Sequence, residues 1–218
     1  MMEAAMDKNG KNIDNKAIPR PFVDVVLEAQ KNWENLEGGK YRVQENVIKK
    51  LFEMHPTNRQ LEDILLKAAV LNDFYSTNIF SIFGVAKHIL SIPNVDEQLA
   101  RGDVKLVNEI RTVSFVSKKG AEKAKDFYSF ATKYCSHHRP NLYPIYDGYV
   151  GKVLCYFRNK DKFADFKNDD LKDYEKFKNV INEFQRFYRL ERFSVKELDR
   201  YLWQLGKKYF PLKKIKET

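Results

Sequence analysis

The sequence contains little cysteine. Its 218 residues include two, Cys135 and Cys155. Two thiols are too few for a disulfide framework or for a four-cysteine zinc or iron–sulfur site. We therefore expect two free thiols in a reducing cytoplasm, no bound metal and no cofactor.

Long apolar runs are also missing. No stretch approaches the roughly 20 apolar residues that a membrane-spanning helix needs. Residues 1–20 lack the apolar segment of a signal peptide and are typical of a flexible polar lead-in. We expect a soluble cytoplasmic protein that does not act at a membrane.

A third scarcity is the alternation of apolar and polar residues that is typical of β-strands. Apolar residues instead recur at helical spacing, as in Tyr174, Phe177, Ile181 and Phe184, which share one face of a helix. The expected helices cover residues 21–36, 43–54, 57–77, 79–92, 96–102, 104–113, 118–138 and 172–190, with two more starting at 147 and 194. The pattern predicts a single all-α domain over residues 21–218.

Two residue pairs have the spacing of a capping box, in which two side chains three positions apart bond each other's backbone. Thr57 and Gln60 form one pair, and Ser194 and Glu197 form the other. They predict that helices start at residues 57 and 194.

Positive charge exceeds negative charge. The chain has 39 Lys and Arg against 30 Asp and Glu, a formal net charge of +9. Such an excess suits a polyanionic partner, because each phosphate that a cation neutralises releases bound counterions. The alternative is that the charge serves solubility alone.

Much of this charge lies between residues 117 and 152. Backbone N–H groups at a turn such as the one around Gly120 can hold a phosphate, and a neighbouring lysine such as Lys118 adds charge. Arg139 and Lys152 are further candidate contacts to nucleic acid. The alternative is an ordinary charged face in contact with water.

His137 and His138 lie in the run "CSHHR". Adjacent residues of a helix point about 100° apart and do not easily join one metal site. No Cys-x-x-Cys pair elsewhere could complete such a site. We therefore expect no zinc, and we expect the two histidines to lie at a helix end or to contact phosphate.

Asp147 stands in "YPIYDGYVGKVL", between a proline-containing turn and a helix. Asp is a preferred N-cap residue and is favoured at the positive end of the helix dipole. A carboxylate at the start of a helix can also take part in catalysis if it faces a cleft. Both interpretations are open, and they are compatible.

The order of these parts resembles the helix-hairpin-helix (HhH-GPD) DNA glycosylases, which include endonuclease III, the adenine glycosylase of mismatch repair and 8-oxoguanine glycosylase. In that family a hairpin, a helix and a loop lead to an aspartate, which opens the pattern D-x-x-V-x-x-x-L. Asp147, Val150 and Leu154 match it. The stretch "YSTNIFSIFGVAKHI" resembles the family's polar break between two helices. The turn "SKKGAEK" departs from the family in having one glycine rather than two.

The resemblance implies an all-α fold of two helical lobes and base-excision chemistry on double-stranded DNA with a damaged or modified base. The base would be rotated out of the duplex, and Asp147 would stabilise positive charge on the sugar or orient a water molecule. The lysine that attacks the sugar in some members would be Lys119 or Lys123. Thr77 and Asn78 would probe the duplex near the target base.

Three functions follow from these observations. The favoured one is a monomeric DNA glycosylase, with or without lyase activity, in which Phe127, Tyr146 or Tyr149 stacks on the extruded base. The second is a non-catalytic nucleic-acid-binding module with the same fold. The third is an all-α protein-interaction domain.

Overall fold

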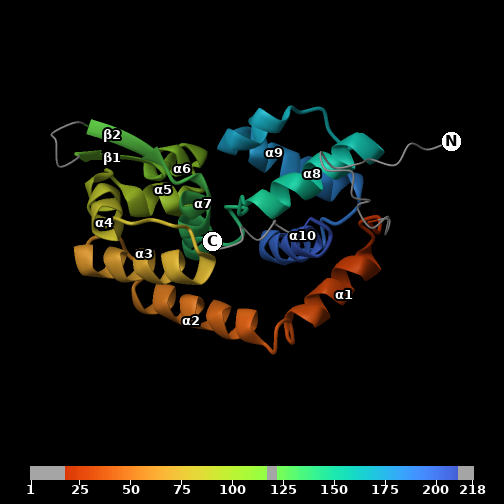
Figure 1. Ribbon diagram of the computed structural model, residues 1–218, viewed down its shortest axis with the longest axis horizontal. Coiled ribbons are helices and arrows are strands. Elements are labelled where there is room, and N and C mark those ends of the chain that lie inside the picture. The colour runs from red at the N-terminus through yellow and green to blue at the C-terminus, as the bar shows by residue number, and fades with distance from the viewer. Residues whose placement is uncertain (1–17, 117–121, 211–218) are drawn as a thin grey trace, which may run out of the picture.

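The computed structural model describes residues 18–116 and 122–210. Within these ranges ten α-helices, one short 3-10 helix and a two-stranded ribbon follow one another (Figure 1). The α-helices are α1 Val23–Trp33, α2 Lys40–Met54, α3 Leu61–Tyr75, α4 Ile82–Ser91, α5 Val95–Arg101, α6 Val104–Arg111, α7 Tyr128–His138, α8 Gly148–Asp161, α9 Tyr174–Phe187 and α10 Val195–Tyr209. The 3-10 helix η1 covers Asn168–Lys172, and the strands are β1 Thr112–Val116 and β2 Glu122–Asp126. The all-α class is confirmed, apart from the ribbon.

Helix length and polarity also bear on membranes. Among the helices of residues 18–116 and 122–210, none combines the length and the apolar character needed to cross a bilayer.

The C-terminal helices follow the predicted pattern. In α9 the expected apolar face, which includes Phe177 and Phe184, is buried in the core. The capping box at the start of α10 is confirmed: the Ser194 hydroxyl accepts from the Glu197 N–H at 3.3 Å, and the Glu197 carboxylate accepts from the Ser194 N–H at 2.8 Å. Local sequence signals therefore determine this part of the fold.

The capping box expected at residue 57 is wrong. Helix α3 starts at Leu61 after Gln60, which makes no capping bond with its side chain. The residues before it form a loop that is tied to α5, because the backbone N–H of Asn58 donates to the Asp96 carboxylate at 3.1 Å and its side-chain amide at 2.7 Å. The contact between Asn58 and Asp96 of α5 therefore fixes this segment, and the local capping box between Thr57 and Gln60 does not form.

The helix expected over residues 118–138 is wrong over residues 122–127, because residues 122–126 form strand β2 and α7 starts after Phe127. Strands β1 and β2 pair there in an antiparallel ribbon, and α7 begins at Tyr128. Val113 is buried whereas Ser114 is exposed, the two-residue alternation of a strand. Helix α4 packs closely against the ribbon, because a Cβ at Gly84 would lie 2.8 Å from the ring of Phe115. The three site candidates of the turn, Lys118, Lys119 and Gly120, lie outside the described residues.

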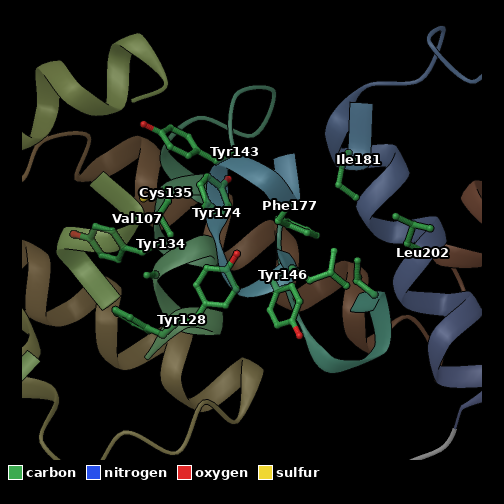
Figure 2. Packing of buried hydrophobic residues seen from close by; sticks show 14 of the residues in the cluster. Val107, Tyr128, Tyr134, Cys135, Tyr143, Tyr146, Tyr174, Phe177, Ile181 and Leu202 are labelled. Atoms are coloured by element: carbon green, nitrogen blue, oxygen red, sulfur yellow. The ribbon is translucent and has the colours of Figure 1, made fainter. Parts of the chain in front are cut away.

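Figure 1 shows α3 to α7 and the ribbon gathered on one side, and α1 with α8 to α10 on the other. Buried aromatic side chains lie between α7, α9 and the loop before α8 (Figure 2). The ring centroids of Tyr128 and Tyr146 are 4.8 Å apart. The Tyr174 hydroxyl donates to the Pro144 carbonyl oxygen at 3.1 Å. Tyr146, one of the side chains expected to stack on a base, is part of this core and is 9% exposed.

Candidate functional site

Asp147 is the N-cap residue of α8. Its Oδ1 accepts from the backbone N–H groups of Tyr149 and Val150, both at 2.9 Å. The same residue lines a cavity of about 450 Å³ whose walls come from α1, α2, α3, α7, α8 and α10. The two interpretations of Asp147 therefore coexist in one geometry, since the capping carboxylate also borders a cavity.

Lys133 of α7 lines the same cavity. It is 4% exposed, and its Nζ donates to the Ser129 hydroxyl at 2.6 Å. Burial lowers the pKa of Lys133 below its ordinary value, while the carboxylates of Asp147 and Asp199 act in the opposite direction. A lysine with a depressed pKa spends a larger share of time as the neutral amine, which is the nucleophilic form.

Asp199 of α10 is the second acid of the cavity. It is 6% exposed, and both carboxyl oxygens lie 3.2 Å from the backbone nitrogen of Ile145. Burial raises the pKa of Asp199 to about 8, although Lys196 opposes the shift. At neutral pH this carboxyl group is mostly protonated, so it can donate a hydrogen bond as well as accept one.

Aromatic side chains form another wall. The chain contains two tryptophans, and both Trp33 and Trp203 line the cavity together with Tyr41. The ring centroids of Tyr41 and Trp203 are 4.9 Å apart, and those of Trp33 and Trp203 are 5.9 Å apart. Such rings offer flat apolar faces on which a planar ligand can stack.

Glu45 of α2 holds this wall in place. Its carboxylate accepts from the indole N–H of Trp33 at 2.9 Å and forms ion pairs with Arg200 at 2.7 Å and Lys196 at 3.1 Å. Burial opposes the ionisation of Glu45, but the two cations outweigh it and the pKa is lowered. One carboxylate thus joins α1, α2 and α10 at the edge of the cavity.

The close crossing of α8 and α10 brings Asp147 near Asp199 and Trp203. A Cβ at Gly206 would lie 2.6 Å from the Cβ of Tyr149, so glycine permits this approach. The first turn of α8 therefore lies directly against α10.

His137, His138 and Arg139 line a different hollow, of about 550 Å³, next to α2. His137 Nε2 lies 2.8 Å from the Tyr75 hydroxyl, and His138 Nε2 lies 3.3 Å from Lys67 Nζ. Burial lowers the pKa of both histidines, so they are neutral at neutral pH and bring no positive charge to a phosphate.

The other predicted site residues are spread over the surface. Lys123 is exposed on β2 and Lys152 is exposed on α8. Thr77 and Asn78 lie in the loop between α3 and α4, where the Thr77 hydroxyl donates to Asn72 Oδ1 at 2.8 Å. Of the predicted catalytic residues that the structure describes, Asp147 borders the cavity and Lys123 does not.

The sequence interpretation missed Lys133 as the lysine of the site, and it missed Asp199 and Trp203. One signal was present for Lys133. It occupies a position in "SFATKYC" among residues that a helix buries, such as Phe130 and Tyr134. A lysine on the buried side of a helix requires either polar partners or a cavity.

The arrangement of possible metal ligands is the last feature of the site. In residues 18–116 and 122–210, no three His, Cys, Asp or Glu side chains are grouped so that they could hold a metal ion.

The chain is similar to one family model and to one known protein, as follows. The family model described as "HI_0787_N: N-terminal domain" matches residues 25–142. An uncharacterized protein of Haemophilus influenzae (strain Rd) is 52% identical over 154 residues, which is 71% of this chain and 71% of that protein. No solved structure matches.

The matched range contains Trp33 and Lys133, whereas Asp147, Asp199 and Trp203 follow it. The cavity is therefore built jointly by the matched domain and the helices after it. The chain belongs to the HI_0787_N family.

Proposed function

We propose that this protein is a DNA glycosylase with lyase activity, which removes a damaged or modified base from double-stranded DNA as a monomer. The observation that carries the proposal is the meeting of Lys133 and Asp147 in one cavity with aromatic walls. The order of motifs that resembles the helix-hairpin-helix glycosylases supports it. The net charge of +9 is consistent with a polyanionic substrate.

Lys133 is the nucleophile in this proposal, in place of Lys119 or Lys123. Its Nζ forms a bond to C1′ of the sugar as the bond between C1′ and the base nitrogen breaks. The electron pair of the broken bond leaves with the base, which takes up a proton, and Nζ loses one. The sugar ring then opens to a Schiff base with Lys133. The Schiff base makes the C2′ proton acidic. When that proton is lost, the C3′–O3′ bond breaks and its electron pair leaves with the 3′ phosphate, which cleaves the strand. Water then hydrolyses the Schiff base and regenerates the amine.

Asp147 acts on the charge that develops during this step. Bond breaking leaves positive charge on the sugar, and an ionised carboxylate nearby stabilises it. The two N–H groups that Asp147 accepts from keep the carboxylate fixed before the substrate arrives. The capping bonds thus serve catalysis by holding the group in one orientation.

The aromatic wall and Asp199 would receive the extruded base. A base is planar and stacks well on indole and phenol rings such as those of Trp33, Trp203 and Tyr41. Stacking is tolerant of sequence, so hydrogen bonds must select the base. Asp199, mostly protonated at neutral pH, supplies one donor or acceptor for this selection.

The test uses duplexes that carry 8-oxoguanine, uracil, an alkylated base or an abasic site. Base release is measured, and the Schiff base is trapped with borohydride. We expect the wild-type protein to release at least one of these bases. Lys133→Gln should lose both release and the trapped adduct. Asp147→Asn should lose release while it keeps the helix cap, because Asn is an equally good N-cap residue.

Lys50→Gln is the matched control, because Lys50 is an exposed lysine of α2 that does not line the cavity. It should leave release unchanged. An adduct that survives in Lys133→Gln would overturn the assignment of the nucleophile. Binding to DNA without release of any base would favour the non-catalytic module. No binding to DNA at all would favour the protein-interaction domain.

A further inference from the structure

Phe80 is 93% exposed, more than any other exposed large hydrophobic side chain within the described residues. It lies in the loop between α3 and α4, and Phe83 in the first turn of α4 is 51% exposed. A single exposed apolar side chain needs no explanation, but two aromatic rings within four residues form a small apolar surface. The question is what covers it.

The loop holds Phe80 outward. Asn72 Oδ1 accepts from the Thr77 hydroxyl at 2.8 Å and from the Ile79 N–H at 2.9 Å. Ile79 itself is 4% exposed and anchors the loop in the core. The backbone of Ile79 is held by a hydrogen bond and its side chain is held in the core. The fold therefore directs the next side chain, that of Phe80, into solvent.

Lysines accompany both rings. Lys125 Nζ of β2 lies 5.8 Å from the centroid of the Phe80 ring, and Lys87 Nζ lies 5.0 Å from that of Phe83. Lys123 is also exposed, and it shares a face of the ribbon with Lys125 because they are two positions apart on one strand. We call Phe80, Phe83, Lys87, Lys123 and Lys125 the Phe80 corner.

This combination fits a nucleic-acid strand better than other partners. Nucleic-acid bases stack on aromatic rings, and the phosphates between them pair with lysines. A second copy of the chain would bring a second set of lysines against the first, which repel each other. An anionic lipid surface would pair with the lysines and take up the apolar rings as well. The nearby cavity, whose aromatic walls suit a planar base, favours the nucleic-acid strand.

The loop that carries Phe80 begins at the cavity. Ser76 lines the cavity, and Phe80 follows it four residues later. This loop offers a path for a strand that places one base in the cavity. We infer that the Phe80 corner holds the nucleic-acid strand beside the cavity, with the Phe80 ring stacked on one of its bases. The inference rests on the proposed function for the strand that enters the cavity.

The test measures the affinity of labelled DNA, both single strands and duplexes with an abasic-site analogue, by fluorescence anisotropy. We expect Phe80→Ala to weaken binding about 5- to 100-fold, which is the usual effect of losing one base-stacking ring. Phe80→Trp should retain binding. Lys125→Gln should weaken binding and should lower the slope of log affinity against log salt by about one.

Phe22→Ala is the matched control. Phe22 is 57% exposed, and the guanidinium of Arg20 lies 5.8 Å from its ring centroid, so the local chemistry is nearly the same. This variant should bind DNA as the wild type does. Equal losses in Phe80→Ala and Phe22→Ala, or no loss in Phe80→Ala, would overturn the inference.

Two further measurements separate the outcomes. If the protein binds vesicles of phosphatidylserine and phosphatidylcholine but does not bind DNA, the partner of the Phe80 corner is a membrane surface and the inference is overturned. If Phe80→Ala changes the sedimentation coefficient but not the affinity for DNA, the partner of the corner is a second copy of the chain and the inference is overturned. The proposed function can fail while the inference about the corner holds. This is the outcome if the wild-type protein releases no base but Phe80→Ala still weakens DNA binding.

Discussion

Among the residues that the structure describes, two lysines are buried, Lys67 and Lys133, and their surroundings differ. Lys67 of α3 is fully buried, and its Nζ donates to the carbonyl oxygens of His55 at 3.0 Å and Thr57 at 2.8 Å, and to Asn58 Oδ1 at 2.9 Å. Lys133 is nearly as buried, but its Nζ donates to a single residue, Ser129, whose hydroxyl lies at 2.6 Å and whose carbonyl oxygen lies at 3.5 Å. Lys133 also borders a cavity.

The pKa does not distinguish the two. Burial lowers the pKa of Lys67 to about 8 despite the carboxylates of Asp96 and Asp63, and it lowers that of Lys133 as well. The two lysines differ in their acceptors, which come from three residues around Lys67 and from one residue beside Lys133. They also differ in that a cavity lies beside Lys133. Lys67 fills its site and joins the end of α2 to α3, whereas Lys133 has room for a reaction partner. A depressed lysine pKa indicates function when it occurs beside an open cavity.

The largest expected effect is on catalysis at Lys133. Lys133→Gln should reduce base release by more than about a thousandfold, as expected for loss of a nucleophile. Stability should change by less than about 1 kcal/mol, because few bonds are lost. Single-turnover base release and urea unfolding check the two statements. A large loss of stability would make Lys133 a structural lysine like Lys67.

The next effect is on stability at Lys67. Lys67→Met should lower the free energy of unfolding by about 3 kcal/mol, because one buried and two part-buried oxygen atoms lose their donor. The midpoint of urea unfolding, followed by circular dichroism, measures it. The rate of base release per folded molecule should stay within about threefold of wild type. A specific loss of rate would contradict the contrast with Lys133.

A smaller effect concerns pH. Because the pKa of Lys67 is lower in the folded state, the unfolded state binds the proton more strongly, and stability rises with pH between the two pKa values. From about pH 7.5 to about pH 9.5 the wild type should gain about 2 kcal/mol relative to Lys67→Met. Comparison with that variant cancels the contributions of other groups, such as Asp199. Parallel stability curves for the two proteins would show that Lys67 does not titrate in this window.

The smallest effect is expected at the acceptor of Lys133. Ser129→Ala removes the hydroxyl that positions Nζ, and base release should fall about tenfold. Unfolding free energy should fall by no more than about 1 kcal/mol. The borohydride-trapped adduct should still form, since the amine remains. Complete loss of the adduct would mean that Ser129 does more than orient the lysine.

The helices and the cap at Asp147 could be predicted from sequence because their signals are local. Apolar spacing located α9, and a capping box located the start of α10. The ribbon escaped prediction because the helix expected over residues 118–138 includes the residues of β2. Its strand signal, the alternation of Val113 and Ser114, is short.

The cavity could be predicted only in part. Whether Lys133 faces water or a cavity depends on how α2, α3 and α10 pack around α7, which no local pattern encodes. Asp199 and Trp203 lie one turn apart on α10, where the sequence predicts a helix but no site. Asp199 lies three positions before Leu202, which is fully buried, so an acid on the buried face of the helix was the available signal.

The aromatic wall has a practical consequence. Since both tryptophans of the chain line the cavity, its intrinsic emission comes from one site. A ligand that stacks there should quench or shift the emission of the whole protein. The molecule thus contains its own spectroscopic probe, and libraries of free nucleobases can be screened against it without a label or an assay of activity.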